Sequence, residues 1–451
     1  MKYVPSANIL IFALLFISAP LLLQAQDDYS SGDVLIRGGN LLTITQGDLE
    51  NTDILIMDGK IVEIGQNLTA DEGVPVIDAT GRYVMPGIVD AHSHVGLDAV
   101  NEATNPITAE VAIADVINPY DIALYHALAG GVTVSHAMHG SANVIGGQNQ
   151  TIKHRYGTLN PSDLVMEGAP RTIKFALGEN PIRVHGEGYN TVPNTRMGVE
   201  TVIRQGFDAA LNYREDWEEY RQKSERGEIA IPPSYNKRHE VMLDILDGKI
   251  LIHCHSYRSD EIYMLMNVCR DYGIDQLIFQ HVNEGFKVAP ELAEFGAMAS
   301  VFSDWWAFKF EVYYSTAYNT TILAQNGVIT SVNSDSRELI RHLYLEAAKA
   351  QRYGQLNDNE TLKLITLNPA IQLGIDHRVG SLDIGKDGDI AIFNGHPLSI
   401  YTIPEYTFVD GKMYFNRDED PADMRVHIDA EEEFESYLEL KSGRGDHDCM
   451  H

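Results

Sequence analysis

The chain has 451 residues, of which 44% are hydrophobic and 22% charged, a composition typical of globular proteins and not of disordered or collagen-like chains. Its 64 acidic residues exceed its 34 basic residues, so the formal net charge is −30. This excess argues against a nucleic-acid partner, and three cysteines are too few for a disulfide framework.

The first 25 residues have the pattern of a secretory signal peptide. Lys2 supplies the positive start, an apolar run covers residues 9–23, and residues 24–26 offer a cleavage site. The run is interrupted by Ser18 and Pro20 and is shorter than the ~20 residues that a membrane-spanning helix needs. We therefore expect a secreted or periplasmic protein with no stable membrane anchor after cleavage; an uncleaved anchor is the alternative.

Short β-rich segments separated by turns occur near both ends of the mature chain. They cover residues 34–36, 54–57, 61–64, 389–393 and 406–409. The turn Asp58-Gly59 favours a hairpin in the first group. From these flanks we infer a small β-sandwich domain built from residues 26–85 together with 374–416. An acidic C-terminal tail, residues 417–451, follows it.

Between these flanks, residues 86–373 alternate between short apolar runs and helical stretches. Strand–helix alternation over this length predicts an α/β fold with a (β/α)8 TIM-like barrel, since such barrels have typically ~250 residues. A doubly wound sheet is the alternative, but no glycine-rich phosphate loop follows an early strand. Residues 186–237 exceed what a barrel needs, and we expect a helix at 197–225 within an insertion over the barrel mouth.

Ionisable residues stand at or near the C-terminal ends of the predicted strands. His92 and His94 are two residues apart, so on a strand they point to the same side and can reach one metal ion. The later strands are followed by, or end in, Lys174, His253, His255, His281 and Asp335. Because barrel active sites form at the C-terminal strand ends, these positions together predict a metal site.

With these residues the sequence resembles the amidohydrolase superfamily, most of all its imidazolonepropionase-like, dipeptidase-related branch. The resemblance includes the segments 86–94, 366–370 and 380–389. It implies that one or two divalent metal ions are held by six residues, namely His92, His94, a carboxylated Lys174, His253, His281 and Asp335. Zinc is the leading candidate, because histidine and carboxylate ligands suit it, although manganese and iron also fit.

Two ligand assignments stay open at this point. His255 is a rival to His253 as the ligand from the fifth barrel strand. Glu179 is a rival to Lys174 as the group that bridges two metal ions, because its carboxylate needs no modification. Relatives without a bridging group hold a single metal ion, so the second choice also decides the metal count.

A divalent ion lowers the pKa of bound water toward ~7 and polarises a carbonyl group. Asp335 can accept a proton from this water and pass it to the leaving nitrogen. We therefore expect a metal-dependent hydrolase of C–N bonds. Its partner is a small-molecule or peptide substrate, and the leading class is a peptide or an N-acyl amino acid. The alternatives are a cyclic amidase or deaminase-type hydrolase of the same superfamily, or a catalytically silent binding protein of the envelope.

Four further residues are candidates for substrate binding, namely His139, His255, Tyr257 and Arg258. Arg258 has the clearest chemical reason, because a guanidinium group can pair with a substrate carboxylate through two parallel hydrogen bonds.

Overall fold

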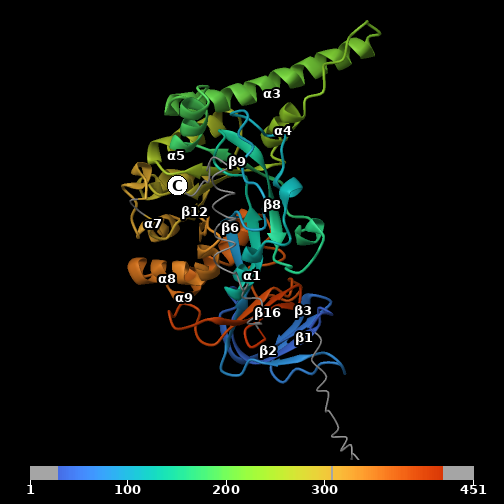
Figure 1. Ribbon diagram of the computed structural model, residues 1–451, viewed down its shortest axis with the longest axis vertical. Coiled ribbons are helices and arrows are strands. Elements are labelled where there is room, and N and C mark those ends of the chain that lie inside the picture. Colours follow the sequence, from blue (N-terminus) through green and yellow to red (C-terminus); the bar gives the residue numbers. More distant parts are fainter. Residues whose placement is uncertain (1–28, 306–307, 420–451) are drawn as a thin grey trace, which may run out of the picture.

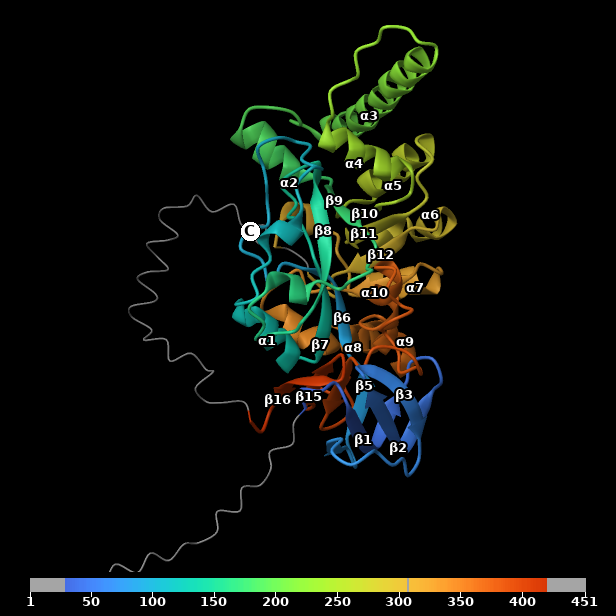
Figure 2. The same ribbon diagram turned by 90° about the vertical axis from the view of Figure 1, so that its right-hand side faces the viewer.

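The computed structural model describes residues 29–305 and 308–419 of the chain, which form two sheets with helices packed around one of them (Figures 1 and 2). Within these residues, no helix is both long and apolar enough to cross a membrane. The expected signal peptide, residues 1–25, and residues 420–451 of the expected acidic tail lie outside the described residues.

One sheet is a nearly closed eight-stranded barrel, which confirms the predicted fold class. Its strands, in order around the barrel, are β6 (Ile88–Ser93), β7 (Val132–Ala137), β8 (Ile145–Lys153), β9 (Thr172–Ala176), β10 (Leu251–Ser256), β11 (Leu277–His281), β12 (Met298–Val301) and β13 (Thr330–Val332). Neighbouring strands are parallel except at β8, which runs antiparallel to both β7 and β9. The link between β7 and β8 is too short for a crossover helix, so the two strands form a hairpin.

The first and last barrel strands, β6 and β13, are joined through side-chain and backbone contacts at their C-terminal ends. The amide of Asp335 donates a hydrogen bond to the carbonyl of His92 at 3.0 Å. Asp90 Oδ1 accepts hydrogen bonds from the amides of His92, at 3.1 Å, and Ser334, at 3.2 Å. The Asp90 carboxylate therefore closes the barrel beside two of the predicted metal ligands.

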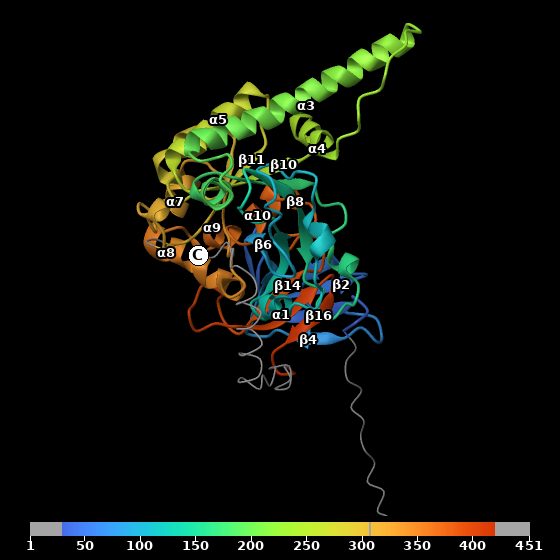
Figure 3. The same cartoon turned by 45° about the horizontal axis from the view of Figure 1, so that its top comes forward.

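The helices are α1 (Ile122–Ala129), α2 (Glu179–Ile182), α3 (Arg196–Glu225), α4 (Lys237–Leu246), α5 (Ser259–Asp271), α6 (Ala289–Phe295), α7 (Asn319–Gln325), α8 (Leu343–Gly354), α9 (Asp358–Lys363) and α10 (Leu367–Gln372). The helix expected at 197–225 is present as α3, and its first half packs against the outer side of the barrel. Phe175, which alternates with the inward-facing Lys174 on β9, points outward and stacks on Phe207 of α3 with ring centres 6.2 Å apart. The buried side chains of α3 end at Tyr213, and beyond it the helix extends past the rest of the molecule (Figures 1 and 3).

The second sheet also has eight strands, and we call it the small sheet because it belongs to the smaller unit of the chain; it lies at the opposite end of the molecule from α3 (Figure 2). Its strands, in hydrogen-bonded order, are β16 (Lys412–Asn416), β15 (Pro404–Val409), β14 (Ile390–Phe393), β5 (Tyr83–Pro86), β1 (Val34–Leu42), β2 (Asp48–Met57) and β3 (Lys60–Gly65), with β4 (Val76–Asp78) paired to β1. Strand β5 pairs with both β1 and β14, so both chain ends build one unit, as predicted. Where the sequence predicted a sandwich, these strands belong to one continuous hydrogen-bonded sheet.

A buried lysine fastens the barrel to this sheet. Because β8 runs antiparallel to its neighbours, its last residue, Lys153, lies at the edge of the barrel that faces the small sheet. The Lys153 Nζ donates to Asp387 Oδ2 at 2.7 Å, to Asp389 Oδ1 at 2.8 Å and to Asp410 Oδ1 at 2.5 Å. The three carboxylates are close enough to hold a metal ion, but Lys153 Nζ already lies among them and forms an ion pair with each.

Candidate functional site

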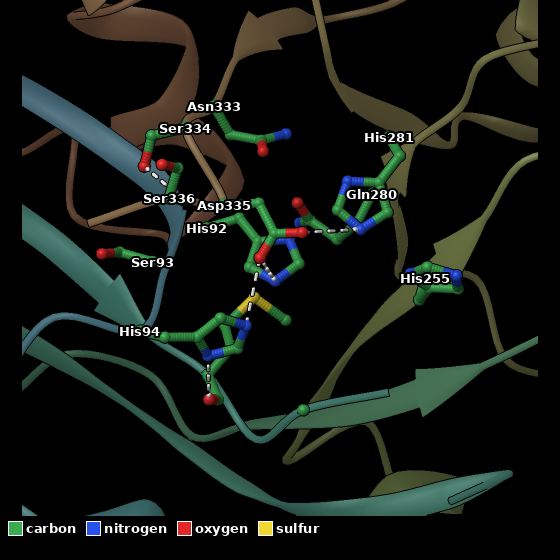
Figure 4. A network of polar contacts seen from close by, with 12 residues as sticks. His92, Ser93, His94, His255, Gln280, His281, Asn333, Ser334, Asp335 and Ser336 are labelled. Carbon is green, nitrogen blue, oxygen red and sulfur yellow. Dashed lines mark hydrogen bonds and ion pairs between the residues drawn. The ribbon is translucent and has the colours of Figure 1, made fainter. Parts of the chain in front are cut away.

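Strand β6 delivers two histidines to the C-terminal edge of the barrel. His92 is fully buried within the strand, and His94 follows its last residue. His94 Nδ1 lies 2.9 Å from the carbonyl of Met138, so this nitrogen carries the proton and donates it. His94 Nε2 lies 3.1 Å from Asp335 Oδ1, and His92 Nε2 lies 3.4 Å from the same oxygen (Figure 4). These two ring nitrogens and the carboxylate oxygen are close enough together to bind one cation.

Asp335 and His281 complete the group from β13 and β11. His281 Nε2 lies 3.7 Å from Asp335 Oδ2, and the rings of His92 and His281 stack with centres 4.8 Å apart (Figure 4). Both residues have left-handed backbones, with φ of 69° at His281 and 42° at Asp335. Such conformations cost about 1–3 kcal/mol each and cluster at functional sites, where the surrounding structure holds them. His92, His281 and Asp335 thus offer three ligand atoms within 4.8 Å of one another.

Burial sets the charges of this group. Burial lowers the pKa of His92 well below its ordinary value and lowers that of His281 to about 3, so both rings are neutral. Burial alone would raise the pKa of Asp335, but the hydrogen bond with His94 and the nearby histidines and Lys174 lower it below its ordinary value. Neutral imidazoles and an ionised carboxylate are the protonation states that bind a divalent metal.

Lys174 and Glu179 occupy different places, although five residues apart in the sequence. Lys174 is fully buried inside the barrel, with Nζ 3.1 Å from His92 Nε2. Glu179 begins α2 at the barrel mouth, where its carboxylate lies 3.7 Å from Lys309 Nζ and 3.5 Å from Arg183 Nη2. The structure therefore brings Lys174, and not Glu179, together with the histidines.

Both histidines of β10 point into the barrel, but at different depths. His253 pairs with Lys174 in the sheet, and its ring lies 4.4 Å from that of His136, deeper in the barrel. Its Nδ1 contacts Gln280 Nε2 at 3.0 Å. His255, one step closer to the C-terminal edge, has its ring 4.7 Å from that of His281. The structure thus brings His255 to the group and leaves His253 below it.

The other candidates for substrate binding are spread over three environments. The Tyr257 ring lies 4.5 Å from the His255 ring and 5.5 Å from the His281 ring, next to the group. Arg258 is 39% exposed and binds Asp260 through Nε at 3.0 Å and Nη2 at 2.9 Å. His139 contacts backbone with both ring nitrogens, at 3.0 Å and 2.9 Å, and burial lowers its pKa to about 4. Its ring is thereby held in place and offers no nitrogen to a substrate.

Sequence reasoning missed Lys309 and an aromatic wall, both from the segment that follows β12. Phe302 stacks on His281 with ring centres 4.4 Å apart, and Trp305 stacks on Phe302 at 4.3 Å. Lys309 Nζ lies 4.7 Å from the centre of the Tyr257 ring, and burial lowers the pKa of this lysine. The sequence pattern that could have indicated them is a lysine within a run of aromatic residues after a barrel strand.

Comparisons with known proteins identify relatives of this chain. A sequence model described as the amidohydrolase family matches residues 315–415. The crystal structure of an amidohydrolase from Thermotoga maritima MSB8 is 33% identical, covers 85% of this chain and 100% of its own, and superposes with a TM-score of 0.78.

Two further relatives differ more from this chain, one because it is a much longer protein and one because its sequence is more distant. Amidohydrolase tasK from Hapsidospora irregularis is 30% identical over 371 residues, which are 76% of this chain and 38% of that protein. The chain therefore spans about two fifths of the length of that relative. An adenosine deaminase from Xanthomonas campestris with bound zinc shares the fold at 18% identity and a TM-score of 0.54, over 90% of this chain and 99% of its own.

Proposed function

The chain belongs to the amidohydrolase family, and from this premise we propose that it hydrolyses the C–N bond of peptides or N-acyl amino acids. Family membership and the His/Asp cluster make it a metal-dependent hydrolase; the substrate class is our proposal. One observation supports metal-dependent hydrolysis most directly: neutral histidines from β6 and β11 converge on the ionised Asp335 after β13.

Six residues are proposed as metal ligands, namely His92, His94, Lys174, His255, His281 and Asp335. The set contains His255 in place of the expected His253, because the ring of His255 lies 4.7 Å from His281 while that of His253 lies beside His136. Zinc is the proposed metal, since histidine and carboxylate ligands suit it. The distant adenosine deaminase with bound zinc has the same fold.

The unpartnered nitrogens of the group fit a metal ion. Among the described residues, the buried nitrogens without a hydrogen-bond partner include Nδ1 of His92, Nε2 of His253, Nδ1 of His255 and both ring nitrogens of His281. Buried polar atoms without partners cost about 1–3 kcal/mol each, and a cation bound to one nitrogen of a ring removes the cost for that atom. When bound, a divalent ion polarises the scissile carbonyl and makes water a better nucleophile at neutral pH.

The protein's own groups position and move the protons of this reaction. Hydrolysis adds the water oxygen to the acyl carbon, breaks the C–N bond and transfers a proton to the leaving nitrogen. Asp335 is ionised, and the hydrogen bond from its own amide to His92 fixes its position. It is therefore the proposed base that takes the proton from the attacking water and returns it to the leaving nitrogen.

Lys174 is the proposed bridging residue. Its side chain is fully buried with Nζ 3.1 Å from an imidazole nitrogen, a costly place for an ammonium group. A carboxylated Lys174 would turn this cation into an anionic oxygen ligand and permit two metal ions. A single ion would leave Lys174 as an ammonium or a neutral amine.

We also propose that the protein is exported, on the pattern of Lys2 and the apolar run at residues 9–23. Cell fractionation followed by N-terminal sequencing tests this. A cytoplasmic protein that keeps residues 1–25 would contradict it.

The experiment for the enzymatic proposal measures bound metal and product together. Protein purified without chelator is analysed by elemental mass spectrometry and incubated with N-acetyl amino acids and dipeptides, with amine release as readout. We expect bound divalent metal, amine release, loss of activity with a chelator and recovery with zinc. Bound metal with release of ammonia or opening of a cyclic amide would favour the deaminase or cyclic amidase alternative. Absence of both metal and turnover would favour a silent binding protein.

A further inference from the structure

A buried cation lies at the mouth of the barrel beside the proposed metal ligands. Lys309 precedes the short turn Phe310–Val312, and its side chain is 11% exposed. Its Nζ lies 4.7 Å from the centre of the Tyr257 ring. That ring in turn lies 4.5 Å from His255 and 5.5 Å from His281. One aromatic side chain thus bridges the ammonium group and the histidines.

The contacts of Lys309 suit an anion-binding role. Its Nζ donates to the neutral Asn180 Oδ1 at 3.0 Å, whereas Glu179 Oε1 is 3.7 Å away, beyond hydrogen-bond distance. Asn180 Nδ2 lies 3.4 Å from His255 Nε2, so the amide links the lysine to the histidine group. A lysine ammonium has three N–H donors, and a buried one is costly unless paired. Glu179 forms an ion pair with Lys309 at the longer distance, and a carboxylate that enters the site would add a direct charge-assisted hydrogen bond.

Arg258, the candidate for this role by sequence, is engaged elsewhere. Both its Nε and Nη2 donate to Asp260, which satisfies its bidentate face. It lines a cavity of about 370 Å³ together with Lys287, Tyr313 and Tyr314. Of Arg258 and Lys309, it is therefore Lys309 whose charged group lies against the Tyr257 ring.

We propose that Lys309 binds the free carboxylate of the amino acid on the leaving side of the scissile C–N bond, with the Tyr257 ring beside it. This inference rests on the proposed function, because it names the part of the substrate recognised at the same site. It restricts the substrates to peptides with a free C-terminus and N-acyl amino acids. Substrates capped as carboxamides carry no charge for Lys309 to pair with.

The test compares each active substrate with its carboxamide. Wild-type protein and three variants, Lys309→Met, Lys309→Arg and Arg258→Met, are loaded with metal and assayed on N-acetyl amino acids, glycyl dipeptides and their amides. For wild type we expect a KM for the acid about 10- to 100-fold below that for the amide, the range that one charge-assisted hydrogen bond supplies. Lys309→Met should lose this preference through KM, Lys309→Arg should keep most of it, and Arg258→Met should keep it.

A binding measurement separates this inference from the proposed function. Calorimetric titration with an N-acetyl amino acid and its amide needs no turnover, and circular dichroism shows whether each variant is folded. If wild type hydrolyses nothing, the proposed function fails, while tighter binding of the acid that is lost in Lys309→Met still supports the subsite. The proposed carboxylate subsite is overturned if wild type binds acid and amide with equal affinity, or if Lys309→Met still prefers the acid. If only Arg258→Met loses the preference for the acid, Arg258 and not Lys309 binds the carboxylate.

Discussion

The substitution Lys153→Met tests how the barrel is fastened to the small sheet. Lys153 is fully buried and donates to Asp387, Asp389 and Asp410 at 2.7, 2.8 and 2.5 Å. Methionine has similar length and removes only the ammonium group. The expected effect depends on which of the three carboxylates is left without a cation.

Two of the three carboxylates keep other partners. Asp387 still pairs with Arg378 at 2.7 Å, and Asp410 still pairs with Arg155 at 2.7 Å. Asp389 is fully buried among them and relies on Lys153. Breaking one buried ion pair costs about 3–5 kcal/mol, because an uncompensated charge remains. We therefore expect Lys153→Met to lower the free energy of unfolding by about 3–5 kcal/mol, and not by three times that amount.

The loss should depend on pH. Burial raises the pKa of Asp389 to about 6 although Lys153 lowers it, so removal of Lys153 raises this pKa further. The ordinary pKa is 3.8, so between these values the folded state binds a proton that the unfolded state does not. Stability then falls as pH rises through this window, by about 1.4 kcal/mol per pH unit at most. Lys153→Met should thus be more damaging at pH 8 than at pH 5.5.

Equilibrium urea unfolding, followed by circular dichroism at about pH 5.5 and about pH 8, measures both effects. The matched control is the double variant Lys153→Met with Asp389→Asn, which removes the stranded charge and should recover part of the loss. A loss below about 1 kcal/mol at the higher pH would refute the argument, since a stranded buried charge costs more. So would an equal loss at both pH values together with no recovery in the double variant.

Three further predictions concern the candidate site. His255→Ala should reduce bound metal per chain, while His253→Ala should retain it; elemental analysis showing the reverse would restore His253 as ligand. Lys174→Met should lower a count of two ions to one or none, while Glu179→Gln leaves it unchanged, and two ions in Lys174→Met would assign the bridge to Glu179. Asp335→Asn, with its metal content verified, should lower kcat by about 10²- to 10⁴-fold at neutral pH, the range of general acid–base catalysis, and full turnover would exclude the proton-transfer role.

The sequence predicted the fold from features that are local. β-rich segments at both chain ends and strand–helix alternation between them lead to the composite sheet and the barrel, because each depends only on nearby residues. The antiparallel β8 was not predicted, although the short connection from β7 leaves no room for a crossover helix. Likewise, the sequence could not show that α3 packs on the outer face of β9. Its partner there is Phe175, and the outward direction of that side chain is known only once the orientation of the strand is known.

The candidate site was predictable to the level of strand ends and no further. Alternation puts His253 and His255 on the same face of β10, but the depth of each depends on the stagger between β10 and β11, which pairs His255 with Gln280 and Ser256 with His281. Lys309 reaches the site from an irregular segment after β12, whose path no periodicity describes. The residues that depend on register or loop conformation are therefore the ones that the sequence left open, such as His253 and His255, or did not reveal, such as Lys309.

Asp90 connects barrel closure to the metal site, and this connection can be tested separately from catalysis. Its Oδ1 accepts from the amides of His92 and Ser334, and burial raises its pKa to about 7. Asp90→Ala leaves two buried amides without this acceptor and should cost about 2–5 kcal/mol, while Asp90→Asn keeps an acceptor oxygen and should cost about 1 kcal/mol. Since His92 and Asp335 lie on the two segments that Asp90 joins, Asp90→Ala should also weaken metal binding about 10- to 100-fold. Urea unfolding and competition with a chromophoric chelator measure the two effects. An alanine variant that loses stability but keeps its metal affinity would show that closure of the barrel does not position the ligands.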